Sequence, residues 1–259
     1  MSNELQLKSE TALATVPIDL DTLAKDAELG GKVGLKDIAI PYLYVMQALT
    51  PQANPDNDKY IEGASAGMFL LTVKNKIYDG RKEGIKVVLC YYERRIMEWI
   101  PREQGGGLVG SYPADDPIMN QARPNDRGQM MLPNGHQLMD TAYHYVLVYD
   151  KSDETWTQAI MPLKSTALKV SRKLNSELST SMVPGKKQKA PRFLFEYNIK
   201  TAKEQKDENV WSSPVFVQGD IVSLEVYNAA KEYAKIAAQN LLSRAPEPTE
   251  QATAGDLPF

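Results

Sequence analysis

The 259-residue chain has few of the residues that build disulfide frameworks and metal sites. It contains one cysteine, Cys90, and two histidines, His136 and His144. A single cysteine excludes an internal disulfide framework and indicates a reducing compartment, and the histidine spacing does not fit a Cys/His zinc site. Cys90 lies in the apolar run IKVVLCYY, so we interpret it as a core residue.

Long apolar runs and catalytic signatures are also missing. No run approaches the ~20 apolar residues of a membrane helix, and the first residues lack the pattern of a secretory signal. The sequence therefore predicts no membrane partner and a cytoplasmic location, that of a host cell if a phage encodes the protein. Residues 105–110 (GGGLVG) lack the Lys-Ser/Thr of a phosphate-binding loop, and no GxSxG motif occurs. Asp115 and Asp116 remain a candidate for a nuclease metal site, but we expect a non-catalytic protein without metal or cofactor.

Acidic residues are scarce in one part of the chain. Residues 164–203 contain ten basic and two acidic residues, whereas residues 1–30 contain two basic and six acidic ones, and the net charge of −3 hides this segregation. A basic block in an acidic protein points to a polyanionic partner. A solvated protein face is the alternative interpretation.

The order of the segments predicts three parts. Residues 1–31 form an acidic, partly disordered arm with a short helix near residues 19–27, and residues 32–243 form one domain. Residues 244–259 form a tail, because RAPEPTEQATA has no apolar period and cannot bury enough surface to offset chain entropy. Residues 42–48 are expected to form one or two helical turns, and residues 101–135 an irregular insertion that is functional or mobile.

Period-2 alternation predicts short paired strands within the domain. They cover residues 68–73, 85–92 with 96–100, 143–149, 155–161, 193–199 and 210–217. Asp79-Gly80 marks a turn, and Pro162 is expected to stop its strand. Helices are predicted at residues 165–178, capped by Ser165 or Thr166, and at 221–243 after a turn at Gly219-Asp220. This order indicates an α+β, mainly antiparallel β fold: an OB-like barrel with long loops, an inserted basic helix and a C-terminal helix.

Cations and aromatic residues alternate along the predicted strands and the basic helix. Single-stranded nucleic acid binds where bases stack on rings and phosphates pair with Lys or Arg. The aromatic candidates are Tyr92, Trp99 and Trp156, whereas Phe193, Phe195 and Tyr197 have the alternation of a buried face. The basic candidates are Lys74, Lys76, Arg81, Lys82, Lys86, Arg94, Arg95, Lys164, Lys169, Arg172, Lys173, Lys186, Lys187, Lys189 and Arg192.

Three segments carry a resemblance to a known group. IKVVLCYYERRIMEWIPRE, YHYVLVYD and MPLKSTALKVSRKLN, within residues 68–200, resemble phage-encoded single-stranded DNA-binding proteins. The last residues, GDLPF, resemble the acidic-hydrophobic tip of bacterial and phage proteins of that class. The resemblance implies an OB-like core that coats replication or recombination intermediates, and a tip that recruits replication and recombination proteins through Asp256, Leu257, Pro258 and Phe259.

Other functions are compatible with the same residues. A strand-annealing recombination protein would share the basic block, and so would a virion or scaffold protein that binds packaged DNA. The long loops and the acidic arm differ from the compact bacterial proteins, which leaves the oligomeric state open, a homo-oligomer included.

Overall fold

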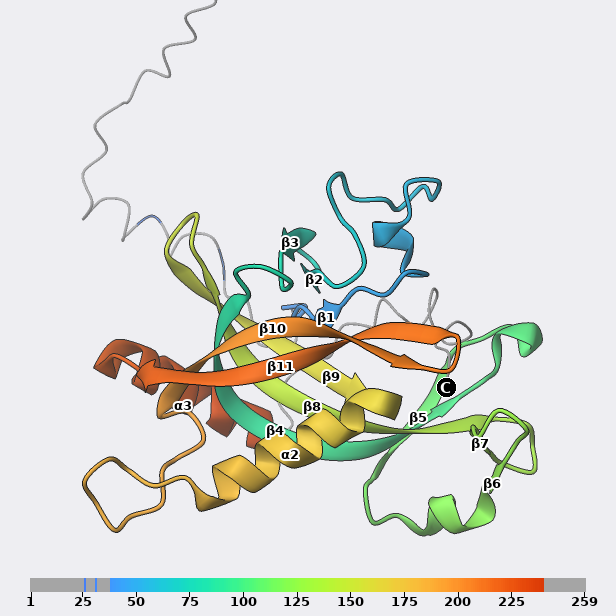
Figure 1. The fold of residues 1–259 in the computed structure, drawn as a ribbon. Coiled ribbons are helices and arrows are strands. Elements are labelled where there is room, and N and C mark those ends of the chain that lie inside the picture. Colours follow the sequence, from blue (N-terminus) through green and yellow to red (C-terminus); the bar gives the residue numbers. More distant parts are fainter. Residues whose placement is uncertain (1–25, 27–30, 32–37, 240–259) are drawn as a thin grey trace, which may run out of the picture.

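The computed structural model describes Asp26, Gly31 and residues 38–239 (Figure 1). Apart from Asp26 and Gly31, the predicted arm with its helix near residues 19–27 lies outside these residues, and so does the tail with its tip. In the described part, no helix is both long and apolar enough to span a bilayer.

Eight antiparallel strands form the main sheet in the order β11-β10-β4-β8-β7-β6, with β5 also paired to β4 and β9 to β8. The central strands β4 and β8 are long. One half of each is apolar on both faces and lies in the barrel, and the other half extends beyond the barrel. The bounds are β4 (Ile85–Trp99), β5 (Leu108–Pro113), β6 (Arg123–Pro124), β7 (Met130–Met131), β8 (Gln137–Asp150), β9 (Thr155–Lys164), β10 (Phe195–Lys206) and β11 (Asn209–Ile221).

A three-stranded sheet of β1 (Leu43–Val45), β2 (Phe69–Leu71) and β3 (Lys76–Tyr78) lies across the main sheet. On one side Tyr42 forms a parallel bridge with Ile160 of β9. On the other side the Thr201 amide of β10 donates to the Gly80 carbonyl at 2.8 Å. The strands thus curl into a half-barrel, the OB-like α+β fold that the sequence predicts.

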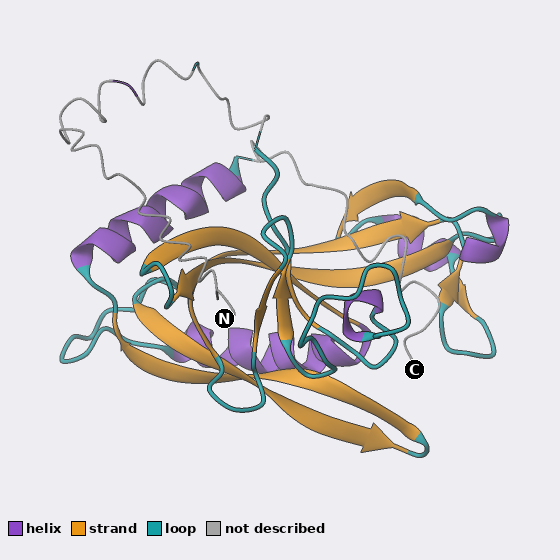
Figure 2. Ribbon diagram, turned by 90° about the horizontal axis from the view of Figure 1, so that it is seen from above, coloured by secondary structure: helices purple, strands orange, loops and turns teal. Residues whose placement is uncertain are grey.

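Two helices cover opposite faces of the β4–β8 region (Figures 1 and 2). Leu174 and Leu178 of α2 (Leu168–Thr180) pack in the cluster that contains Leu89. Tyr233 of α3 (Leu224–Ala238) packs in the cluster that contains Cys90. Successive strand residues point to opposite faces, so this arrangement explains why β4 is apolar on both and confirms Cys90 as a buried residue.

The insertion at residues 100–136, which we call the lobe, is more regular than its glycines and prolines suggest. It contains β5, β6 and β7 and the 3-10 turns η4 (Arg102–Gln104) and η5 (Pro117–Gln121). The outer halves of β4 and β8 extend into it, and the lobe has its own core of Ile96, Ala122, Leu132 and Leu138. The prediction of an irregular segment was therefore wrong, because pairing with these long strands organises it.

Four local predictions about the type or the ends of elements were wrong. Residues 43–45 form strand β1, because they pair with β2. β9 continues through Pro162 to Lys164; strands tolerate proline where one side has no ladder partner. Neither Ser165 nor Thr166 caps α2, since a 3-10 turn, η6 (Ser165–Ala167), precedes it.

The fourth error concerns the end of β11. Gly219-Asp220 lies within this strand, because Phe195 still pairs with Ile221, and α3 begins only at Leu224. The Asp79-Gly80 turn also has a different cause from the one expected. Gly84 has the positive φ, +80°, whereas Gly80 is constrained by the Phe69 ring, 2.6 Å from where a Cβ would lie.

Candidate nucleic-acid interface

Helix α2 presents one polar face because its other face is held against the sheet. Leu174 and Leu178 are buried, and the hydroxyl of buried Ser171 lies 2.8 Å from Nε2 of His144. The spacing of 3.6 residues per turn then turns the remaining positions outward. Three exposed cations occupy them: Lys169, Arg172 and Lys173.

The segment that follows, residues 181–191, is here called the basic loop. It folds back on itself, since the Val183 amide donates to the Gln188 carbonyl at 2.8 Å and the Ala190 amide to the Ser181 carbonyl at 2.9 Å. This hairpin-like shape exposes Lys186, Lys187 and Lys189. Among the residues that the structure describes, these lysines and Arg172 have no carboxylate partner.

Arg192 anchors the end of the basic loop and does not extend from it. One guanidinium nitrogen, Nη2, donates to Nδ1 of His144 at 2.9 Å, and Nη1 donates to Oδ1 of Asn175 at 3.0 Å. The guanidinium carbon lies 5.3 Å from the Tyr92 ring centre. Burial lowers the pKa of Arg192 to about 10, so it stays cationic at neutral pH. The sequence selected Arg192 as a phosphate contact, but in the structure its guanidinium points inward to His144 and Asn175.

His144 is the neutral centre of that anchor. Because a guanidinium can only donate, Nδ1 of His144 accepts and Nε2 carries the proton toward Ser171. Burial first, and the Arg192 charge second, lower the pKa of His144 to about 3. The anchor therefore keeps one charge state over the physiological range and fixes the loop to both α2 and β8.

Most of the selected cations in β4 and in the turn before it lie next to carboxylates. Lys86 pairs with Glu196 at 2.9 Å, Arg81 with Asp79 at 3.1 Å, and Arg94 is bidentate to Asp140. Arg95 donates to the Ser111 hydroxyl at 2.6 Å and lies 3.8 Å from Glu93. Because neighbouring carboxylates balance these charges, the attraction of these cations for a phosphate is weaker.

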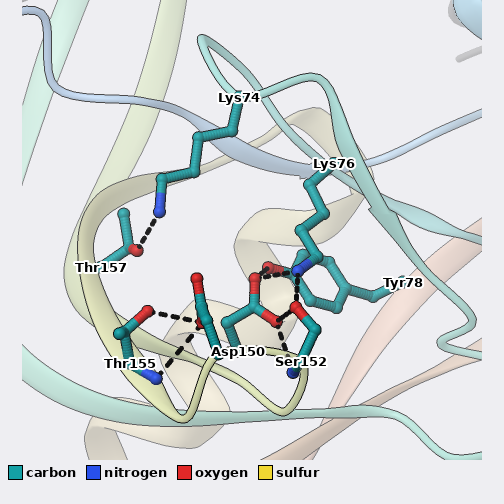
Figure 3. Close-up of polar contacts among 8 residues, drawn as sticks. Lys74, Lys76, Tyr78, Asp150, Ser152, Thr155 and Thr157 are labelled. Carbon is teal, nitrogen blue, oxygen red and sulfur yellow. Dashed lines mark hydrogen bonds and ion pairs between the residues drawn. The ribbon is translucent and has the colours of Figure 1, made fainter. Parts of the chain in front are cut away.

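Lys76 of β3 and Lys74, in the turn before it, bind the β8–β9 hairpin (Figure 3). Lys76 pairs with Asp150 and lies 2.6 Å from the Ser152 hydroxyl, and Lys74 donates to the Thr157 hydroxyl at 2.9 Å. Burial alone would raise the pKa of Asp150, but hydrogen bonds from Lys76 and Ser152 outweigh it and hold the pKa at about 2. Lys82 is exposed nearby, without a carboxylate partner in the described chain.

Two of the three predicted stacking residues, Trp99 and Trp156, pack in the cluster of the α3 face, and the third, Tyr92, contacts Arg192 at the end of the basic loop. Trp99 is 5% exposed, Tyr92 is covered by Arg192 and contacts His144, and Trp156 packs on Tyr149 with ring centres 5.1 Å apart. Trp156 belongs to the cluster beneath α3, on the face opposite α2. Trp99 is therefore not an open stacking platform.

One aromatic residue beside α2 was missed. Trp211 of β11 is half-buried, and the Lys169 ammonium lies 5.9 Å from its ring centre. Lys169 also pairs with Glu204, which faces Trp211 across the β10–β11 hairpin. The sequence offered one signal for it, an aromatic residue directly after the polar turn of the predicted hairpin. The contact of Trp211 with Lys169, about forty residues earlier, depends on the fold.

The structure thus divides the predicted site. It brings together the cations of α2 and the basic loop, with Trp211 next to Lys169; Lys164 ends β9 just before the helix. It separates them from Lys86 and Trp156, which lie on the α3 face. Asp116 of the suspected metal pair instead caps η5 by accepting from the Ile118 amide at 2.9 Å. The described residues contain no cluster of three His, Cys, Asp or Glu side chains that could hold a metal ion.

Comparison with known proteins gives one match. Searches of curated proteins and of solved structures returned none. Residues 8–241, nearly the whole chain, match the model of a phage protein family that is described as Pam3 phage gp34-like. The chain therefore belongs to the Pam3 phage gp34-like protein family.

Proposed function

We propose that this phage protein binds single-stranded DNA, largely independently of sequence, during phage DNA replication or recombination. The observation that carries the proposal is the set of exposed cations on α2 and the basic loop. Arg172, Lys186, Lys187 and Lys189 have no carboxylate partner among the described residues, so their charge is available to phosphates. When these cations neutralise phosphates, the DNA releases its counterions, and this release supplies affinity that does not depend on the base sequence.

The aromatic contribution to this interface comes from Trp211. Its ring lies beside Lys169, and a ring next to a cation is the arrangement on which an unpaired base stacks while its phosphate is neutralised. Duplex DNA offers no exposed base face, so this contact favours single strands. The interface holds DNA without chemistry and needs no cofactor.

The proposal includes a second surface for partner proteins. Asp256, Leu257, Pro258 and Phe259 lie outside the described residues, and their resemblance to an acidic-hydrophobic tip supports a role in recruiting replication and recombination proteins. In this view a chain lacking residues 255–259 binds DNA almost as the full chain does but no longer co-purifies with phage replication proteins. Unchanged co-purification would contradict the role of the tip.

The DNA-binding proposal is tested by fluorescence anisotropy with labelled oligo-dT and with a duplex of equal length, over a range of salt concentrations. We expect tighter binding of oligo-dT and a linear fall of log affinity with log salt, by about 0.7 per phosphate contact for single strands. A flat salt response would contradict the proposal. Equal affinity for both DNAs would favour a virion or scaffold role, and pairing of complementary strands with ring or filament assembly a strand-annealing role.

A further inference from the structure

A cavity of about 400 Å³ lies in the lobe, away from α2. It opens between the segment that follows β4 and the turn that joins β6 to β7. Its apolar wall contains Trp99, Pro101 and Met131, and its polar wall contains Gln104, Arg127 and Gln137. This volume is within the range of small-molecule sites, about 300–1,000 Å³.

Internal contacts hold the cavity walls in place. Oδ1 of Asn125 accepts from the amides of Arg127 and Gln129, at 3.0 and 2.9 Å, which shapes the turn that carries Arg127. On the opposite side buried Glu98 accepts from the Tyr112 hydroxyl at 2.5 Å and lies 2.6 Å from Nδ1 of His136. These contacts brace the segment just before Gln137, so the site is formed before a ligand arrives.

Several polar groups at the cavity are left without partners. The side chains of Gln104, Arg127 and Gln137 make no hydrogen bond to another residue in the part of the chain that the structure describes. The indole nitrogen of Trp99 is buried and likewise lacks a hydrogen-bond partner there. Of these groups the Trp99 nitrogen is the buried one, whereas Gln104 and Arg127 are exposed and Gln137 is half-buried. An unpaired buried donor is rare in folded proteins, and this one belongs to a residue that lines the cavity.

These groups match the parts of a nucleotide. The carboxamides of Gln104 and Gln137 each offer a donor and an acceptor, as the edge of a nucleobase requires. Trp99 and Met131 provide apolar contacts for a planar ring. The Arg127 guanidinium can make paired hydrogen bonds to a phosphate, and the one acidic residue of the wall, Glu103, can accept from a base amino group.

We propose that this cavity binds one nucleotide, with the base between the apolar wall and the carboxamides and the phosphate on Arg127. The inference rests on the proposed function for the source of that nucleotide, which is a unit of the bound DNA strand; a free nucleotide has the same chemistry. Figure 1 shows α2 extending from the basic loop toward the lobe.

Trp99 provides the readout. The chain has three tryptophans, and the double variant Trp156→Phe/Trp211→Phe leaves Trp99 as the only one. Its fluorescence is titrated with deoxycytidine monophosphate, with oligo-dC and with an abasic strand of equal length. We expect a saturable change with the first two ligands and none with the abasic strand, because the base contacts the indole wall.

The variants Arg127→Ala and Arg123→Ala distinguish a specific contact in the cavity from a general effect of positive charge on nucleotide binding. Both arginines are exposed in the lobe, but Arg123 donates to the carbonyls of Asn120 and Ala122 and does not line the cavity. Loss of Arg127 should weaken nucleotide binding about tenfold or more, and loss of Arg123 should leave it near the parent value. Equal losses would overturn the proposal, and matched thermal midpoints check that both variants fold.

The outcomes distinguish this inference from the proposed function. Salt-dependent binding of oligo-dC without a change in Trp99 fluorescence overturns the nucleotide site and leaves DNA binding intact. Strand binding itself is measured on the parent chain, which keeps Trp211. A saturable response of the double variant to the free nucleotide, together with no binding of any strand by the parent chain, supports the site and overturns the DNA-binding proposal. A response to the abasic strand equal to that of oligo-dC also overturns the site.

Discussion

The cations of the strands and the cations of α2 with the basic loop are similar in the sequence but differ in what faces them. Arg94 lies diagonally across from Asp140 in the β4–β8 ladder, and Lys86 diagonally across from Glu196 in the β4–β10 ladder. Such neighbours are close enough to pair. Within residues 38–239, no strand pairs with the basic loop and supplies an acid to its lysines. A count of charges therefore does not locate a polyanion site until the strand register is known.

The largest expected effect comes from removing the unpaired charges. The triple variant Lys186→Gln/Lys187→Gln/Lys189→Gln should bind oligo-dT at least about tenfold more weakly and lower the slope of log affinity against log salt by about two. The reason is that each lysine of the loop can neutralise a phosphate without first leaving a carboxylate. Anisotropy titrations at several salt concentrations measure both quantities.

The matched control removes three paired charges that lie in β4 or in the turn before it. Arg81→Gln/Lys86→Gln/Arg94→Gln loses the same formal charge, but each residue is bound to an acid in the fold. We expect its affinity to stay within about threefold of the parent, because each of these cations is already neutralised by its acid and contributes little charge to a phosphate. If both triple variants lose affinity equally, only net charge matters and the comparison fails.

The sequence predicts the elements that depend on local pattern. The alternation of residues 85–92 and 143–149 gives β4 and β8, and the leucine spacing of residues 168–178 gives α2. Each of these segments buries one face, and the spacing of its apolar residues along the chain shows which type of element it forms. The OB-like class follows from their order.

The pairing of distant residues could not be predicted in this way. Asp140 lies forty-six residues from Arg94, and Glu204 lies thirty-five from Lys169. Arg192 belongs to the same basic run as Lys189, yet its contacts with His144 and Asn175 turn it inward. The cavity of the lobe depends likewise on how the outer halves of β4 and β8 arrange a glycine-rich insertion.

The ion pair of Asp150 with Lys76 should affect stability more than DNA binding. Asp150 is 3% exposed and accepts hydrogen bonds from Lys76 and Ser152 (Figure 3). Asp150→Asn removes the charge and weakens these contacts, so we expect a loss of about 2 kcal/mol in the free energy of unfolding. Denaturant titration measures it, and the affinity for oligo-dT and its salt slope should stay near the parent values.

The same pair has a pH signature. The pKa of Asp150 is about 2 in the folded chain and about 3.9 in an unfolded one. Its contribution to stability is therefore present above about pH 4 and is lost as the pH falls toward 2. The difference in unfolding free energy between the parent and Asp150→Asn should shrink over that window. A difference that stays constant down to pH 2 would show that the charge of Asp150 is not its source.

The smallest expected effect comes from converting a paired cation of α2 into a free one. Glu204→Gln removes the carboxylate that holds Lys169 beside Trp211, and Lys169 then resembles the lysines of the basic loop. We expect oligo-dT affinity to rise about two- to threefold and the salt slope to steepen by less than about one. Stability should change little, because Lys169 is exposed and such pairs contribute only about 0–1 kcal/mol.

Glu232→Gln is the matched control, since it removes the same charge and releases Lys235 on α3, across the sheet from α2. A rise with Glu204→Gln alone locates the DNA on the α2 face; an equal rise with Glu232→Gln would mean that the strand responds to net charge and not to which cations are free.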